Sequence, residues 1–207
     1  MKEIILLIQF FTRIPIKSKI DYNEEKYGKS TYLLPLIGLI IGGIVFFVYE
    51  GSSYAKIPMY FIAFICLVSN IILTGALHLD GVADTCDGLF SYRTKERMLE
   101  IMKDSHIGVN GVIALVIAIL GKGLLYFSVE IIPIVLSIVV GRLAIIMSAS
   151  FGEYARDRGM AIAIIKYNNY KGFLKSLLIT TLIFLCFKNY FINLMLTLIF
   201  AYIMHIN

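Results

Sequence analysis

Long apolar stretches alternate with short polar segments along the chain. Because a helix of about 20 apolar residues crosses a bilayer core, six of these stretches predict membrane-spanning helices. Their approximate bounds are 31–49, 57–79, 107–129, 131–151, 173–187 and 190–206. A shorter apolar run near the start predicts an interfacial helix over residues 3–12, since it lacks the small residues of a signal-peptide cleavage site. The fold class expected is therefore all-α, a polytopic bundle.

The basic residues between these stretches alternate in number. In chain order, the segments before and between the six spans hold 6, 1, 4, 0, 4 and 1 Lys or Arg residues. Loops rich in Lys and Arg stay on the cytoplasmic side of a membrane. The alternation predicts a multi-pass protein of the cell (inner) membrane with a cytoplasmic N-terminus and with segment 80–106 in the cytoplasm.

Composition supports the membrane interpretation. Of 207 residues, 59% are hydrophobic and 16% are charged, whereas soluble domains have about half and a quarter. The net charge of +5 lies mostly between the apolar runs, so the lipid bilayer and an anionic substrate are the expected partners, and nucleic acid is not. Without a visible domain boundary or repeat, residues 1–207 are expected to form one integral membrane domain, and homo-oligomers are compatible with it.

An acidic run follows the second predicted span. Asp80, Asp84 and Asp87 are spaced so that, in a helix, their carboxylates lie on one side. Three such charges repel one another unless a cation neutralises them, and an all-oxygen ligand set suits magnesium. These residues predict an Mg²⁺ site. A solvated acidic loop that caps a helix is the alternative, since acidic residues favour helix starts.

The next segment, 93–106, predicts an amphipathic cytoplasmic helix. Arg93, Arg97 and Lys103 are candidates for binding phosphate oxygens, and ordinary pairs with neighbouring glutamates are an equal alternative. Asp104 is expected to be either a fourth metal ligand or a helix cap.

Three further residues carry open alternatives. Arg142 lies in mid-span, where a charge needs a partner, so it is either a phosphate-binding or a packing residue. Arg156 belongs to a polar patch that suits substrate or lipid headgroups equally well. His78 precedes the aspartates, where it either orients a carboxylate, transfers a proton or has no catalytic role.

The chain resembles a known family at these residues. The strongest likeness runs from His78 to Phe90, then through Arg93 and Arg97 to Ser105. Smaller matches are Thr12-Arg13-Ile14-Pro15, Pro35-Leu36-Ile37-Gly38, and Tyr154-Ala155-Arg156 with Gly159. Together they are similar to the cobalamin-5′-phosphate synthases, also called adenosylcobinamide-GDP ribazoletransferases, over essentially the whole chain.

The resemblance implies a magnesium-dependent transferase late in cobalamin biosynthesis. Its substrates would be adenosylcobinamide-GDP and α-ribazole or α-ribazole 5′-phosphate, and its products GMP and adenosylcobalamin or its 5′-phosphate. Asp80, Asp84, Asp87 and Asp104 would hold the metal, with Asp84 and His78 in catalytic roles. Residues expected at substrate phosphates are Arg13, Arg93, Arg97, Lys103, Arg142 and Arg156.

One departure concerns the C-terminal side. The family pattern implies a further Gly- and Thr-Gly-Asp-containing segment and a last apolar span after the point where this sequence ends, at Asn207. If that segment contacts substrate, a form without it would be partly or wholly inactive.

Alternative functions differ in their motifs. A CDP-alcohol phosphotransferase would show Asp-Gly-x-x-Ala-Arg, whereas Asp84 follows Ala83 here. A divalent-cation transporter would place its acidic site near mid-membrane, and the aspartates lie at the predicted boundary. A non-catalytic scaffold is the third alternative.

Overall fold

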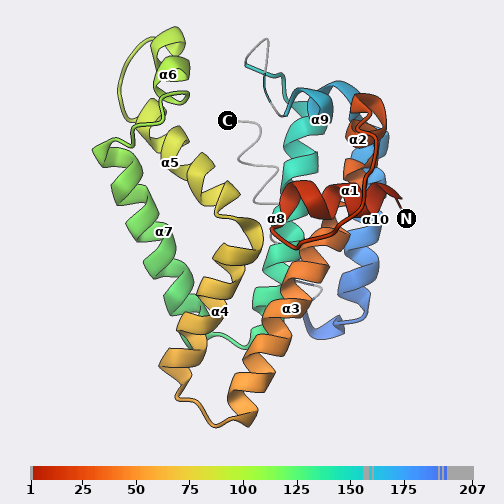
Figure 1. Cartoon of the computed structure of the whole chain (residues 1–207), viewed down its shortest axis with the longest axis vertical. Coiled ribbons are helices and arrows are strands. Elements are labelled where there is room, and N and C mark those ends of the chain that lie inside the picture. Colours follow the sequence, from red (N-terminus) through yellow and green to blue (C-terminus); the bar gives the residue numbers. More distant parts are fainter. Residues whose placement is uncertain (1, 156–158, 160, 191, 193, 195–207) are drawn as a thin grey trace. The chain divides into compact units, whose positions relative to one another are not determined.

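A computed structural model describes residues 2–155, 159, 161–190, 192 and 194, and all regular structure among them is helical. The all-α prediction is therefore confirmed. The chain forms two compact units, Met1–Phe47 with Glu130–Asn207, and Val48–Val129. Figure 1 labels the elements. In chain order they are α1 (Lys2–Phe11), α2 (Glu24–Ser30), η1 (Thr31–Leu33), α3 (Leu34–Tyr54), α4 (Met59–Thr74), α5 (Leu77–Leu89), α6 (Lys95–Ile101), α7 (Val109–Ser128), α8 (Ile131–Phe151), α9 (Ile162–Tyr167), α10 (Tyr170–Leu185) and η2 (Lys188–Tyr190).

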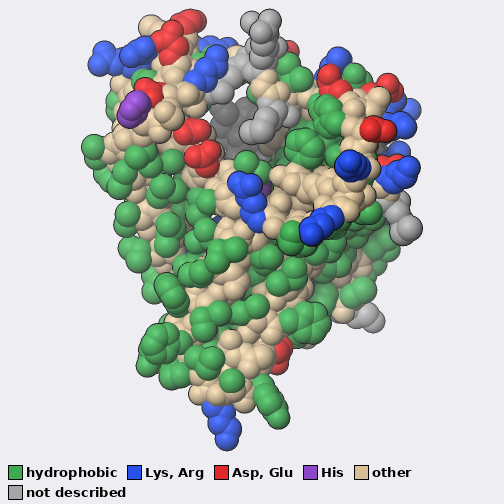
Figure 2. Space-filling model, viewed as in Figure 1, with side chains coloured by type: hydrophobic (Ala, Val, Ile, Leu, Met, Phe, Trp, Pro, Cys, Tyr) green, Lys and Arg blue, Asp and Glu red, His purple; other side chains and the backbone are tan. Residues whose placement is uncertain are grey.

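Several of these helices meet the length and hydropathy of a membrane span. Within the described residues they are Glu24–Tyr54, Val109–Ser128 and Ile131–Phe151, and the bent pair of α4 and α5 would add a fourth. Hydrophobic side chains cover the outside of the long helices (Figure 2). On α7, Val109, Ile117 and Leu124 are each more than half exposed, an apolar surface that a water-soluble monomer rarely presents. The chain is thus a polytopic helical membrane protein.

The predicted spans agree with the helices of the structure to different degrees. The expected span 131–151 coincides with α8, and 31–49 and 107–129 overlap α3 and α7. The fifth, 173–187, overlaps α10, which has 16 residues. Most of the expected span 190–206 lies outside the described residues. Six spans and a cytoplasmic N-terminus remain predictions.

The first unit is organised around α8. Gly38 and Gly42 of α3 lie against it, so that a Cβ at Gly38 would be 2.9 Å from Val139 Cα and one at Gly42 2.8 Å from Val135 Cγ1. Small residues four apart allow this close helix approach in membranes. On another side, Leu136 and Val139 of α8 share a core cluster with Phe184 of α10.

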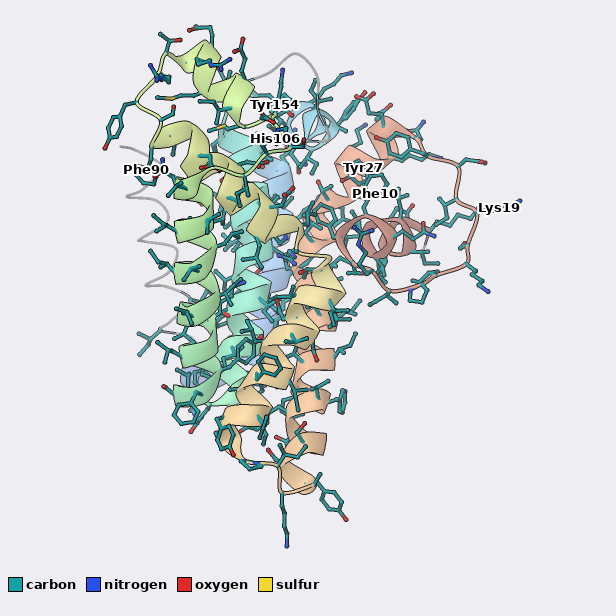
Figure 3. All side chains as sticks on the ribbon, turned by 60° about the vertical axis from the view of Figure 1, so that its left-hand side comes forward. Phe10, Lys19, Tyr27, Phe90, His106 and Tyr154 are labelled. Atoms are coloured by element: carbon teal, nitrogen blue, oxygen red, sulfur yellow. The ribbon has the colours of Figure 1, made fainter. Side chains whose placement is uncertain are left out.

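The helix α1, which was predicted to be interfacial, belongs to this first unit. It runs crosswise to the long helices there (Figure 1) and buries Leu7 and Phe11. The Phe10 ring lies 4.7 Å from that of Tyr27 of α2, centroid to centroid (Figure 3). The side-chain amide of Gln9 donates to the carbonyls of Ile16 and Ser18, at 2.9 and 3.0 Å. These contacts tie the segment after α1 back onto the helix.

The second unit contains α4 to α7 and differs from the sequence expectation at one point. The span predicted over 57–79 ends at Thr74, and the chain bends by 85° into α5. Gly75 and Ala76 both take left-handed conformations, with φ of 59° and 57°. The Ala76 N–H donates to the Ile71 carbonyl at 3.1 Å, which closes the end of α4 as glycine-containing C-caps do. His78 and Asp80 therefore lie in the first turn of a new helix.

A test of the α3–α8 contact is the substitution Gly38→Ala. The new methyl group has no space beside Val139, so the two helices must separate. Overpacking of this kind costs about 1–3 kcal/mol, measurable as a lower free energy of unfolding in detergent micelles. Gly43→Ala is the matched control, because nothing lies within 4 Å of its Cβ. Equal stability of the two variants would contradict the proposed packing.

Candidate active site

Two of the three aspartates of α5 face one pocket. Asp80 and Asp84 are one helical turn apart, so their side chains project in nearly the same direction. They line a depression of about 330 Å³ together with Ala83 of α5 and the segment 102–107. That segment leads from α6 to α7 and contributes Met102, Lys103, Asp104, Ser105, His106 and Ile107. We call this depression the acidic pocket. Charged side chains of both signs gather over this end of the unit (Figure 2).

Asp104 is held in place by its own segment. Its Oδ1 accepts hydrogen bonds from the His106 backbone N–H at 3.0 Å and from the His106 ring Nδ1 at 2.6 Å. The backbone bond first, and the ring bond second, lower the pKa of Asp104, because both favour the charged carboxylate. Asp104 therefore stays charged to a lower pH than an ordinary aspartate.

Asp87 has a different environment. It is 9% exposed and does not line the acidic pocket. Its Oδ2 accepts from the Gly108 N–H at 2.7 Å and its Oδ1 from the Gly111 N–H at 2.8 Å. Both donors belong to the start of α7. The three aspartates share one side of α5, as predicted, yet they do not meet at one point.

The acidic pocket suits one kind of metal ion better than others. Within the described part of the chain, no three acidic, His or Cys side chains converge on a metal position. Asp80, Asp84 and Asp104 nevertheless offer only oxygen atoms to the same pocket. Magnesium is commonly held by one or two carboxylates, with water and substrate phosphates completing its shell. The donor set fits that ion, and it does not form a preassembled protein cage.

Of the six predicted phosphate-binding residues, Lys103 lines the acidic pocket. Arg93 and Arg97 are exposed in the same unit, and Arg97 pairs with Glu100 at 2.6 Å. Arg13 and Arg142 belong to the first unit, and Arg156 lies outside the described residues. Arg142 is 6% exposed, and its Nε has no hydrogen-bond partner among the described residues.

The acidic pocket lacks one predicted residue, His78, and includes two that were not predicted to have a role, Ser105 and His106. His78 is half-buried in the first turn of α5 and is not among the pocket residues. Ser105 and His106 line the pocket, although His106 carries no distinguishing pattern in the sequence. The Asp87 contact with α7 was also missed. The only sign of it in the sequence is that the run Gly108-Val109-Asn110-Gly111, at the start of an apolar helix, follows Asp87 after 21 residues.

The fold and the pocket together define a class of protein. It is a helical membrane protein in which α5 and segment 102–107 bring carboxylates and a lysine into one pocket, groups that proteins use to bind metal ions and phosphates. The profile of the cobalamin-5-phosphate synthase family matches residues 3–207. The chain belongs to this family.

Curated relatives agree with the family assignment. A protein of Clostridium novyi named adenosylcobinamide-GDP ribazoletransferase is 47% identical over 77% of this chain and 65% of its own length. Proteins of the same name from Fusobacterium nucleatum and Clostridium acetobutylicum are 40% and 42% identical. These matches cover 92% and 89% of this chain and 76% and 75% of the relatives. The chain thus spans about two thirds to three quarters of these relatives. No solved structure matches it.

The Asp104–His106 contact predicts a titration effect. In His106→Ala the ring bond is lost and the backbone bond remains, so the pKa of Asp104 should rise but stay below its ordinary value. A lowered pKa means that the charged form, and the contact it makes, are lost only as the pH falls below the usual Asp range. Carboxyl-carbon NMR of labelled protein in micelles measures it. An unchanged titration would show that the ring does not hold this carboxylate.

Proposed function

We propose that this protein is an adenosylcobinamide-GDP ribazoletransferase, a late enzyme of cobalamin biosynthesis. The hydroxyl of α-ribazole, or of α-ribazole 5′-phosphate, attacks the phosphorus bound to the corrinoid. The new P–O bond forms as the bond to GMP breaks, and the product is adenosylcobalamin or its 5′-phosphate. Family membership and the names of the curated relatives support this proposal.

The observation that carries the chemistry is the meeting of Asp80, Asp84 and Lys103 in one pocket. Attack on a diphosphate brings negative charge to the nucleophile and the leaving group, and catalysis consists mainly of positioning and charge neutralisation. Lys103 meets a phosphate oxygen, and Arg93 and Arg97 extend the positive charge beside it. Phosphate contacts by Arg13, Arg142 and Arg156, which the family resemblance implies, remain predictions.

Magnesium is part of this proposal. When bound, the ion neutralises charge on the bridging and leaving oxygens. Asp80, Asp84 and Asp104 are the carboxylates that would hold it, since all three line the pocket. Asp84 is the proposed acceptor of the ribazole hydroxyl proton, because it is the half-buried aspartate of that pocket. His78 assists from the first turn of α5.

The proposed location is the cell (inner) membrane, with the acidic pocket in the cytoplasm. The Lys and Arg counts of the segments between spans support that orientation. The diphosphate of adenosylcobinamide-GDP is charged and cannot cross lipid unaided, so the proposed pocket faces the compartment in which that substrate is made.

The first test is a pair of substitutions, Asp80→Asn and Asp84→Asn. Each removes a charge from the acidic pocket while keeping side-chain size, so GMP release should fall by roughly 10²-fold or more. The purified proteins should keep the wild-type circular dichroism. Glu96→Gln, an exposed acidic position of α6 away from the pocket, is the control and should retain activity. Wild-type turnover by Asp84→Asn would refute the assignment.

Metal removal is a separate test. A chelator should stop GMP release, and added Mg²⁺ should restore it, because the diphosphate charge is then neutralised again. Activity that continues in the chelator would exclude the ion from the reaction. Ion flux into liposomes without any GMP release would support the transporter alternative instead.

A further inference from the structure

The buried carboxylate of Asp87 accepts hydrogen bonds from two backbone N–H groups of another part of the second unit. Gly108, the N-cap residue just before α7, has no side chain and so cannot cap that helix. The first N–H groups of a helix have no partner within it. Two of these donors, of Gly108 and Gly111, point at the oxygens of Asp87, which comes from another helix. Asp87 thus caps α7 from 21 residues away, and its charge complements the positive end of the helix.

The glycines at the start of α7 are matched to this carboxylate. A Cβ at Gly108 would overlap Asp87 Oδ1, and one at Gly111 would overlap Oδ2. The Cβ at Gly111 would also lie 3.0 Å from the Ala83 carbonyl oxygen of α5. Gly121, further along the same helix, has nothing within 4 Å of its Cβ position. Close approach therefore requires glycine at the Asp87 contact and not elsewhere on α7.

Both ends of the pocket segment are fixed to neighbouring residues of α5. At its far end, Ile107 lines the acidic pocket and Gly108 bonds Asp87. At its near end, Met102 packs on Gly88, where a Cβ would lie 2.6 Å from Met102 Cε. Lys103 and Asp104 lie between these two attachments. Their position opposite Asp80 and Asp84 thus depends on how firmly α7 and Met102 are held against α5.

From these contacts we infer that Asp87 is a positioning residue, which anchors the start of α7 and thereby sets Lys103 and Asp104 across the pocket from Asp80 and Asp84. Its oxygens serve backbone N–H groups instead of a metal ion. This inference rests on the proposed function for its catalytic consequence. The anchor itself is a property of the structure and can be tested without any turnover.

The test compares Asp87→Asn and Gly111→Ala, alone and combined, with Gly121→Ala as the matched control. Asn offers one acceptor oxygen where Asp87 uses two, and the Ala methyl displaces the carboxylate while leaving its charge intact. Both single variants should speed hydrogen exchange of the backbone amides at residues 108–111. Both should lower kcat for GMP release by about 10- to 100-fold, and both should still bind Mn²⁺, followed by electron paramagnetic resonance of the metal alone.

The double variant shows whether Asp87 and Gly111 act through one shared contact or independently of each other. Because both changes break the same contact, Asp87→Asn with Gly111→Ala should be no slower than the slower single variant. Gly121→Ala should resemble wild type in all three measurements. Gly38→Ala serves as a stability control, because it should weaken folding in the other unit without changing exchange at 108–111.

A metal-ligand role gives the opposite pattern and would overturn the inference. Asp87→Asn would then lose Mn²⁺ binding with unchanged exchange at 108–111, and Gly111→Ala would keep both binding and activity. If Asp87→Asn does not fold, Gly111→Ala alone decides: unchanged exchange and turnover contradict the anchor. A wild-type protein that releases no GMP would refute the proposed function, and the exchange result would still decide the role of Asp87.

Discussion

An ionised carboxylate loses its hydration in hydrocarbon, and this cost governs the arrangement of the second unit. α4 carries no charged residue, whereas the next thirteen-residue helix, α5, carries three aspartates. The 85° bend between them separates an apolar helix from an acidic one. Gly75 supplies the left-handed turn at no steric cost, and Ala76 adopts the same conformation against its preference. Since α5 departs from the direction of α4, it provides a surface on which α6 and the start of α7 pack.

That surface links the site to the spans. α7 packs its first turn on Asp87 and Ala83, and then continues as a twenty-residue apolar helix with an exposed face. The segment that completes the acidic pocket is therefore held at one end by a membrane helix. Sites that bind substrate need groups held within a fraction of an ångström. Here the polar residues obtain this precision from backbone hydrogen bonds and glycine contacts, which do not depend on long flexible side chains.

Much of this arrangement could be predicted from the sequence. The apolar run over 131–151 predicted both ends of α8. The spacing of Asp80, Asp84 and Asp87 correctly predicted that they lie on one side of one helix. Periodicity fixes the direction of a side chain but not its neighbour. Over seven residues a helix advances about 10 Å, so Asp80 meets the pocket and Asp87 meets the start of α7. Which element covers each position depends on contacts 21 and 24 residues away, and a local pattern contains no information on these.

The bend was missed for a related reason, because the apolar run continues through Gly75 and Ala76 to Leu79.

The separation of the carboxylates has a consequence for the proposed reaction. A preassembled cage of three aspartates would bind a cation tightly without substrate, and its charge would then be largely neutralised before the diphosphate arrived. Asp80, Asp84 and Asp104 share a pocket without converging on one point. On the proposed function, Asp80, Asp84 and Asp104 would hold a magnesium ion together with the diphosphate of the substrate, so that ion and substrate would each raise the affinity for the other. Lys103, placed among the acidic groups by the segment that Asp87 and Gly88 fix, would then contact the diphosphate directly. On that proposal, the pocket would suit the metal ion and the diphosphate together better than either one alone.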